Sequence, residues 1–279
     1  MGIYAVTGGT KGIGEKTVEI LRSYGNEVIN IDIENGDINA DLGTTEGREL
    51  VISQLHKQCP DGLDGLVCNH GITGLPIFKP SYILSVNYFG AVAIIEGLYD
   101  LLKMRKGNCA VTASGAIAYA KRGKYFVDGL LNNCGDEARI CRLVDTFDSQ
   151  TSSGGEEQID GQDDKYNPRI AGNAMYLSSK IALAQWVRRV SSTWAAHGVN
   201  INAVAPGAVA TSIMHGYKKP DAKTFFYPMP ALTDRNGEMD PTDIAHVLAF
   251  LVMPGVNGVS GSIMFCDAGA SAIIDPEKY

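Results

Sequence analysis

The sequence predicts a single α/β domain, built on a doubly wound parallel sheet with helices on both faces. Short apolar runs alternate with longer segments of helical periodicity. A glycine-rich turn follows the first apolar run, and 279 residues, 45% of them hydrophobic, can bury one large core. Because strands that alternate with helices pair in parallel through right-handed crossovers, we expect residues 1–279 to form one domain of Rossmann type.

The predicted elements follow in order along the chain. Strands are expected at 3–7, 27–33, 63–68, 108–113, 199–205 and 262–266, where the apolar runs lie. Asp32 marks the end of the second strand. Helices are expected from the glycine-rich turn to about residue 24, and at 45–58, 81–106 and 172–197. A last helix begins at Asp240, with Pro241 in its first turn.

Two segments interrupt this alternation. An insertion at about 120–170 holds an apolar helical stripe and then the polar, acidic stretch TSSGGEEQIDGQDD. The stripe consists of Ile140, Leu143, Val144 and Phe147. The second segment, at about 212–238, contains FFYPMPAL and is either a packed surface loop or a lid over an apolar ligand.

Composition argues against several classes of protein. With 24 Lys and Arg against 31 Asp and Glu, a net charge of -7 and no basic run, we expect no nucleic-acid partner. The apolar runs fall short of the roughly 18 residues that a membrane span needs, and the N-terminus lacks the pattern of a signal peptide, so we expect a cytoplasmic protein. The six cysteines form no C-x-x-C pair, and the acidic stretch lacks organised ligands, so we expect no metal site.

The glycine-rich turn TGGTKGIG, at 7–14, favours a phosphate-binding site. Its glycines let the backbone approach a pyrophosphate at the N-terminus of the following helix. Asp32 ends the next strand, where a carboxylate accepts hydrogen bonds from ribose hydroxyls and repels a 2′-phosphate, which favours NAD. Lys11 is either a phosphate ligand or a solvated lysine at the start of the helix.

A second group of residues carries acid–base chemistry. Tyr176 and Lys180 lie four positions apart on a predicted helix and share a face, so the ammonium can stabilise a phenolate. Ser114 follows a strand, where its hydroxyl can orient a carbonyl or alcohol oxygen. Asn87 lies inside a predicted helix, where its amide can hold a water or a backbone group.

Together these motifs resemble the short-chain dehydrogenase/reductase family along nearly the whole chain. The resemblance includes Asp41-Leu42 as an adenine-contacting pair and PGAVAT at 206–211 as the segment that holds the nicotinamide carboxamide. Residues 68–71 read CNHG where the family usually has NNAG, so His70 departs from the pattern. The resemblance implies a catalytic tetrad of Asn87, Ser114, Tyr176 and Lys180. It implies that NAD contacts Gly8, Thr10, Lys11, Gly12, Ile13, Gly14, Asp32, Ile33, Asp41, Leu42, Asn69, Gly71, Tyr176, Lys180, Pro206, Val209 and Thr211.

A narrower resemblance is to the bacterial NAD-dependent 3α-hydroxysteroid dehydrogenase/carbonyl reductases. It includes SVNYFGA and an insertion between the catalytic serine and tyrosine, which here stand 62 positions apart. The resemblance implies an NAD-dependent enzyme that interconverts a secondary alcohol and a ketone, with a 3-hydroxysteroid or bile acid as the expected substrate. A dehydrogenase or carbonyl reductase for another apolar or aromatic substrate is the alternative within this class, and a non-catalytic nucleotide sensor is the alternative outside it.

The resemblance also implies a homo-oligomer. Family members often assemble through the helices expected here at 81–106 and 172–197. Because the insertion precedes the second of these helices, we expect it to cover one usual contact face or to build a different one. The stripe from Ile140 to Phe147 is the expected apolar surface of that interface, unless it packs only onto its own subunit.

Overall fold

The computed structural model describes residues 1–75, 77–119, 124–132, 136–152, 168–211, 238–274 and 276–277. The later part of the predicted insertion, at 153–167, lies outside the described residues. So does the predicted lid, apart from its last residue.

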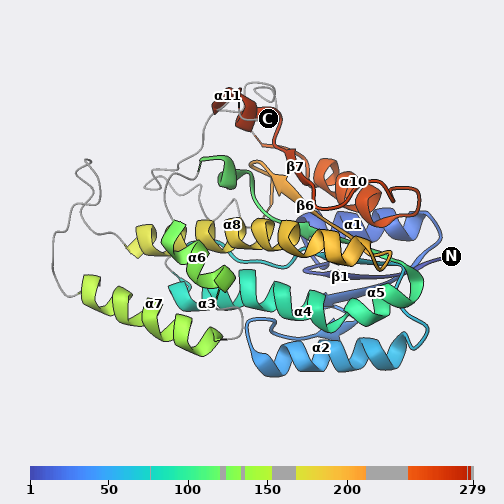
Figure 1. The fold of residues 1–279 in the computed structure, drawn as a ribbon, viewed down its shortest axis with the longest axis horizontal. Helices are drawn as coiled ribbons and strands as arrows, with labels where there is room; N and C mark the ends of the chain where they lie inside the picture. Colours follow the sequence, from blue (N-terminus) through green and yellow to red (C-terminus); the bar gives the residue numbers. More distant parts are fainter. Residues whose placement is uncertain are drawn as a thin grey trace.

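A seven-stranded parallel sheet forms the centre of the molecule, as predicted (Figure 1). The strands are β1 (Ile3–Thr7), β2 (Glu27–Asp32), β3 (Ile38–Asn39), β4 (Gly65–Cys68), β5 (Asn108–Thr112), β6 (Asn200–Pro206) and β7 (Ile263–Cys266). Their order is β3-β2-β1-β4-β5-β6-β7, so the direction of winding reverses between β1 and β4. At such a reversal the loops after the two strands separate, and ligands bind at the carboxyl ends of the strands.

Helices cover both faces of the sheet (Figure 1). One face carries α1 (Gly12–Ser23) and α10 (Pro241–Val252), which pack against each other. The other carries α2 (Thr45–Gln58), α4 (Ala91–Gly97), α5 (Tyr99–Arg105) and α8 (Pro168–Ala195). The short helices η2 (Gly115–Tyr119) and α11 (Ala270–Ile274) follow β5 and β7.

Two hydrophobic cores lie on the two sides of the sheet, because successive side chains of a strand point to opposite faces. In β1, Tyr4 and Val6 belong to the core under α1 and α10, whereas Ala5 belongs to the core under the other helices. In β4, Leu66 and Val67 divide in the same way. This explains why the strands appear in the sequence as continuous apolar runs rather than as alternating ones.

The helix predicted at 81–106 is wrong as a single element. The chain forms α3 (Pro80–Leu84), then a π-helical turn, η1 (Ser85–Gly90), then α4 and α5, which are separated by a bend of 45° near Leu98. A π-helical turn accommodates an extra residue and changes the direction in which the following side chains point. Asn87 lies in this turn and is fully buried.

The described part of the insertion forms two helices, α6 (Lys124–Asn132) and α7 (Glu137–Ser152). Ile140 and Val144 of the predicted stripe are buried in the core of their own chain, where α7 packs against α3. These two residues therefore pack onto their own subunit, which is the alternative left open for the stripe. Leu143 is 61% exposed, and the side chain of Phe147 is outside the described residues.

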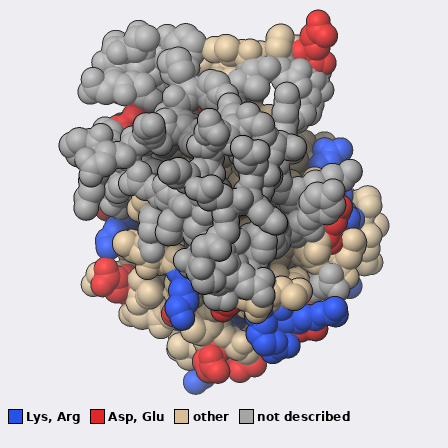
Figure 2. All heavy atoms as spheres, turned by 90° about the vertical axis from the view of Figure 1, so that its left-hand side faces the viewer, with Lys and Arg blue, Asp and Glu red and all other residues tan. Residues whose placement is uncertain are grey.

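The described surface carries charged side chains of both signs (Figure 2). On the face drawn in Figure 2, the described Lys and Arg side chains are interspersed with Asp and Glu side chains. Within the described residues, no single helix has the length and apolar composition of a membrane span, although the bent pair of Pro80–Gly97 and Tyr99–Arg105 passes that test by length and composition. The five described cysteines carry free thiols.

Candidate active site

The turn between β1 and α1 forms a cradle of backbone atoms. Gly8 and Gly12 adopt positive φ angles of 65° and 59°, a conformation that favours glycine. A side chain at Gly14 would collide with the carbonyl group of Gly8, and a Cβ at Gly12 would lie 3.0 Å from Cγ2 of Thr211. Lys11 caps α1 without a side-chain hydrogen bond to the helix, so the first N–H groups of α1 can bind an anion.

Asp32 lies beside this cradle at the end of β2. Its Oδ2 accepts hydrogen bonds from the backbone N–H of Thr10, at 3.0 Å, and from the Thr10 hydroxyl, at 2.7 Å. Lys11 Nζ is 2.9 Å from Oε1 of Glu34, and both side chains are well exposed. Lys11 is thus an exposed lysine that pairs with Glu34, two residues after Asp32. The phosphate cradle itself is formed by backbone atoms.

Asn69, directly after β4, braces the cradle. Its Nδ2 donates to the carbonyl oxygen of Gly8, at 3.1 Å, and its Oδ1 accepts from the Thr112 hydroxyl, at 2.9 Å. These bonds connect the ends of β1, β4 and β5. The Asn69 amide therefore braces the turn at Gly8 and the end of β5.

His70, the departure from the family motif, is held in one tautomer. The Thr7 hydroxyl accepts the N–H groups of Asn69 and His70, at 3.1 and 3.3 Å, which occupies both of its lone pairs. The 2.7 Å contact with Nδ1 of His70 is then where the hydroxyl hydrogen points, which assigns the imidazole proton to Nε2. Sγ of Cys68 lies 3.6 Å from the same Nδ1. Nε2 is buried beside the Val86 backbone and makes no hydrogen bond of good geometry within the described part of the chain.

We expect His70 to stay neutral throughout the physiological pH range. Burial, together with the nearby charge of Lys180, lowers the pKa of its imidazole to about 3. In the unfolded chain the histidine binds a proton below about pH 6.5, so the folded state loses stability as the pH falls from that value towards 3. The free energy of unfolding should fall by up to about 2 kcal/mol more in the native protein than in His70→Asn between about pH 7.5 and about pH 5.

Urea unfolding at the two pH values measures this difference. The ¹⁵N shifts of the His70 ring, assigned with His70→Asn, should show Nε2 protonated and Nδ1 bare. A ring that titrates near pH 6 would contradict the buried, neutral assignment.

Asn87 clamps the loop that follows β4. Its Oδ1 accepts from the N–H of Ile72, at 2.8 Å, and its Nδ2 donates to the carbonyl of Ile72, at 2.9 Å, and to the Ser179 hydroxyl, at 3.3 Å. Of the two roles expected from the sequence, the structure shows that the amide holds a backbone group. Through Ser179 it also reaches the helix that carries Lys180.

Lys180 is buried on α8 and points to the carboxyl end of β5. Its Nζ donates to the carbonyl oxygen of Thr112, at 2.8 Å. Burial lowers the pKa of its ammonium to about 8. A Cβ at Gly71 would lie 3.3 Å from Lys180 Nζ and 3.2 Å from Oδ1 of Asn87, so these two side chains converge on Gly71.

Ser114 and Tyr176 belong to the same region of the fold. Ser114 stands two residues beyond β5, nearly buried, and its Oγ accepts the N–H of Ala116, at 3.2 Å. Tyr176 lies one helical turn before Lys180 on α8 and is half-buried against the core. Because Ser114 follows the strand to which Lys180 donates, the predicted tetrad comes from three neighbouring elements: η1, the end of β5 and α8.

The other expected contact residues lie around the cradle. Ile33, beside Asp32, is 62% exposed, whereas Ile13 is partly buried against the core under α1. The segment 206–211 begins at the end of β6, where the carbonyl of Pro206 faces Gly115, and Val209 forms a parallel bridge with Met239.

Asp41 and Leu42 lie just beyond β3. The Asp41 carboxylate accepts from the Tyr82 hydroxyl and the Gly43 N–H, whereas Leu42 is buried and its carbonyl accepts from Arg48. Sequence reasoning missed Tyr82 and Arg48, together with the bracing hydroxyls of Thr7 and Thr112. Thr7 opens the glycine motif and could have been noticed there, whereas nothing local distinguishes the other three.

The chain thus offers a glycine-lined cradle of backbone atoms, a carboxylate beside it and a buried lysine, which fit the pyrophosphate and riboses of NAD. A family model described as enoyl-(acyl carrier protein) reductase matches residues 166–271. The whole chain is 30% identical to the 3-alpha-hydroxysteroid dehydrogenase/carbonyl reductase of Comamonas testosteroni, with 100% of both chains covered. It is 28% identical to a coniferyl-alcohol dehydrogenase of a Pseudomonas species, over 96% of this chain and 95% of that one.

A solved structure shows the same fold at high similarity. It is the 3-alpha-hydroxysteroid dehydrogenase of a Pseudomonas species complexed with NADH, with a TM-score of 0.81 and 30% identity over 99% of this chain and 100% of that one. The fold and the cradle define an NAD-dependent oxidoreductase that acts on alcohols. The chain belongs to the short-chain dehydrogenase/reductase family.

Proposed function

We propose that the protein interconverts a 3-hydroxysteroid or bile acid and the corresponding 3-oxosteroid. The observation that carries this proposal is the convergence of Asn87 and Lys180 on Gly71, with Ser114 and Tyr176 on the adjoining elements. Similarity along the full chain to a 3-alpha-hydroxysteroid dehydrogenase/carbonyl reductase supports the choice of substrate.

The four residues divide the acid–base work. In the oxidative direction, the Tyr176 phenolate takes the proton of the substrate hydroxyl, and the Ser114 hydroxyl donates to the same oxygen. The Lys180 ammonium stabilises the phenolate and donates to a ribose hydroxyl. Asn87 keeps the loop at Ile72 and Gly71 in place beside Lys180. Bound NAD supplies the hydride acceptor for this reaction.

The cofactor contacts are assigned on the same grounds. The proposed pyrophosphate ligands are the N–H groups of the turn at 8–14, and Asp32 is the proposed ligand of the adenosine ribose. Asp41 and Leu42 are the proposed contacts of the adenine ring, and residues 206–211 the proposed contacts of the nicotinamide. We further propose a cytoplasmic homo-oligomer, as is common for this family.

A panel of 3α-, 3β-, 7- and 12-hydroxy bile acids, assayed with NAD+ and NADP+, tests the substrate. Turnover of a 3-hydroxy compound well above that of the 7- and 12-hydroxy compounds supports the proposal. Coniferyl alcohol belongs in the panel because of the similarity to a coniferyl-alcohol dehydrogenase, which favours an aromatic alcohol as the second candidate. Preference for coniferyl alcohol over every bile acid would replace the steroid proposal.

We expect the Asp32 carboxylate to discriminate against NADP+. Two bonds from Thr10 fix its position, and its charge repels a 2′-phosphate. The kcat/KM for NAD+ should exceed that for NADP+ by at least about tenfold, which corresponds to about 1.4 kcal/mol. Asp32→Ala should narrow this ratio, whereas Glu19→Ala, which removes an exposed acid from the outer side of α1, should leave it unchanged. Equal use of both cofactors by the native enzyme would refute the role given to Asp32.

A further inference from the structure

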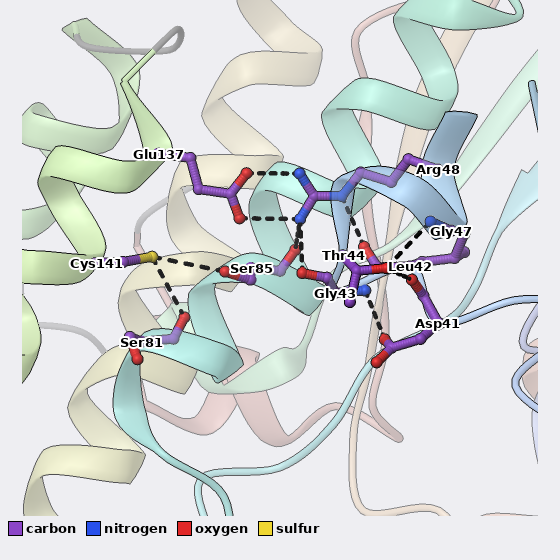
Figure 3. A network of polar contacts seen from close by, with 10 residues as sticks. All are labelled: Asp41, Leu42, Gly43, Thr44, Gly47, Arg48, Ser81, Ser85, Glu137 and Cys141. Atoms are coloured by element: carbon purple, nitrogen blue, oxygen red, sulfur yellow. Dashed lines mark hydrogen bonds and ion pairs between the residues drawn. The ribbon is translucent and has the colours of Figure 1, made fainter. Parts of the chain in front are cut away.

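Arg48, on α2, is a buried arginine that joins the turn at 41–43 to η1 (Figure 3). Its Nε donates to the carbonyl of Leu42, at 2.8 Å. Its Nη2 lies 3.2 Å from the carbonyl oxygen of Gly43 and 2.9 Å from that of Ser85. The guanidinium thus ties the turn at 41–43 to the start of η1. A buried guanidinium that is surrounded by carbonyl groups still needs a counter-charge.

Glu137, the first residue of α7, supplies this counter-charge from the insertion. Its two carboxylate oxygens lie 2.6 Å from Nη1 and 2.9 Å from Nη2 of Arg48, in a two-pronged arrangement (Figure 3). The side chains of Arg48 and Glu137 are 7% and 28% exposed, so the pair is largely shielded from water. Two-pronged pairs of this kind fix the orientation of the guanidinium as well as its charge.

The insertion helix α7 makes further contacts with α3 and η1 beside the pair of Arg48 and Glu137. One turn after Glu137, Cys141 Sγ lies 3.5 Å from Oγ of Ser85 and 3.8 Å from the carbonyl oxygen of Ser81. Ile140 is buried in the core beside them. Glu137 is therefore presented to Arg48 by a packed helix.

Tyr82 holds the same turn from the other side. Its hydroxyl is 2.9 Å from each carboxylate oxygen of Asp41, and its ring lies so close that a Cβ at Gly43 would be 2.5 Å from Cε2. Burial and the neighbouring Asp41 raise the pKa of Tyr82 to about 12, so its hydroxyl remains a donor at neutral pH. The turn is thus fixed at its carbonyl groups by Arg48 and at its carboxylate by Tyr82.

We propose that Glu137 is a positioning residue for the adenine end of the cofactor: by pairing with Arg48 it fixes the turn at 41–43, so the insertion contributes to nucleotide affinity. This inference rests on the proposed contact of Asp41 and Leu42 with adenine. Glu137→Gln leaves the guanidinium charged, buried and without its carboxylate, so Arg48 must move or admit water, and the turn that it holds must move with it.

The test is direct binding of two half-cofactors to the full-length protein. Calorimetry measures the Kd of ADP-ribose, which carries adenine without nicotinamide. The Kd of nicotinamide mononucleotide is measured from the loss of fluorescence as it displaces bound NADH. In Glu137→Gln we expect the Kd of ADP-ribose to rise about tenfold or more, with the Kd of nicotinamide mononucleotide changed less than about twofold. Asp145→Asn removes an exposed acid from the same helix and should leave both constants unchanged.

An unchanged Kd for ADP-ribose in folded Glu137→Gln overturns the inference, and so does an equal loss for both half-cofactors. If Glu137→Gln does not fold, Arg48→Lys takes its place, because lysine keeps the charge but cannot hold the carboxylate and three carbonyl groups together. An unchanged Kd for ADP-ribose in that variant is equally decisive.

Asp41→Asn separates this inference from the proposed adenine contact on which it rests. If Asp41→Asn weakens ADP-ribose binding and Glu137→Gln does not, the contact stands and the role of Glu137 is refuted. If Asp41→Asn has no effect, the adenine contact is wrong and the inference fails with it.

Discussion

Replacing Tyr176 by phenylalanine should reduce kcat by about 100-fold or more. Phenylalanine keeps the ring that packs against the core but removes the only hydroxyl assigned to exchange a proton with the substrate. The Ser114 hydroxyl and the Lys180 ammonium can still polarise the substrate oxygen, so some turnover should remain. Steady-state kinetics with the best alcohol from the bile-acid panel, and with NAD+ saturating, measure the effect.

Two controls show whether this loss is chemical. The Kd of NADH should change far less than kcat in Tyr176→Phe, because Tyr176 is one of many expected NAD contacts and the cradle at 8–14 is untouched. The hydroxyl of Tyr99, on α5, lies 2.6 Å from Nδ1 of His197, just after α8. Tyr99→Phe removes this hydroxyl and should keep native activity. Near-native turnover in Tyr176→Phe would show that another group transfers the proton.

The layered fold could be predicted from the sequence because the central strands are buried on both faces, so both sets of alternating side chains are apolar. Apolar side chains on both faces of β1 and β4 leave continuous runs whose short length is that of a strand rather than a helix. β3 was not predicted, because Ile38–Asn39 is too short for a period of two to appear. The break near Leu98 and the π-helical turn were also missed, since a periodicity averaged over many residues hides one extra residue or one bend.

The candidate site was predictable where a motif determines its own geometry. Gly8 and Gly14 must be glycine because the turn brings them together, and that requirement is readable locally. The bonds of Asn69 and the pairing of Arg48 with Glu137 join residues that are far apart in the sequence, 89 positions in the second case. In its local sequence Arg48 is an ordinary helical arginine, and only the packing of α7 against α3 reveals its burial.

Lys180→Met should make the protein more stable and much less active. Below about pH 8 the native protein carries a buried ammonium there, because burial lowers the pKa of Lys180 from 10.5 to about 8. The unfolded chain keeps this proton up to about pH 10.5, so the buried charge costs up to about 3 kcal/mol at neutral pH, and the cost disappears as the pH rises from 8 to 10.5.

Methionine removes this cost but also the hydrogen bond to the Thr112 carbonyl, which offsets about 1 kcal/mol. We therefore expect the free energy of unfolding to rise by roughly 1–2 kcal/mol at pH 7, with the gain shrinking to nothing by about pH 10. At the same time kcat should fall by about 100-fold and the Kd of NAD+ should rise by about tenfold, since the phenolate and the ribose both lose their cation. Urea unfolding across this pH range, combined with calorimetry of NAD+ binding, measures both changes. Lys57→Met, at the exposed end of α2, is the matched control and should alter neither quantity. A loss of stability at pH 7 in Lys180→Met would show that the buried ammonium contributes to the fold, and that its activity loss reflects damage to the structure rather than the missing charge.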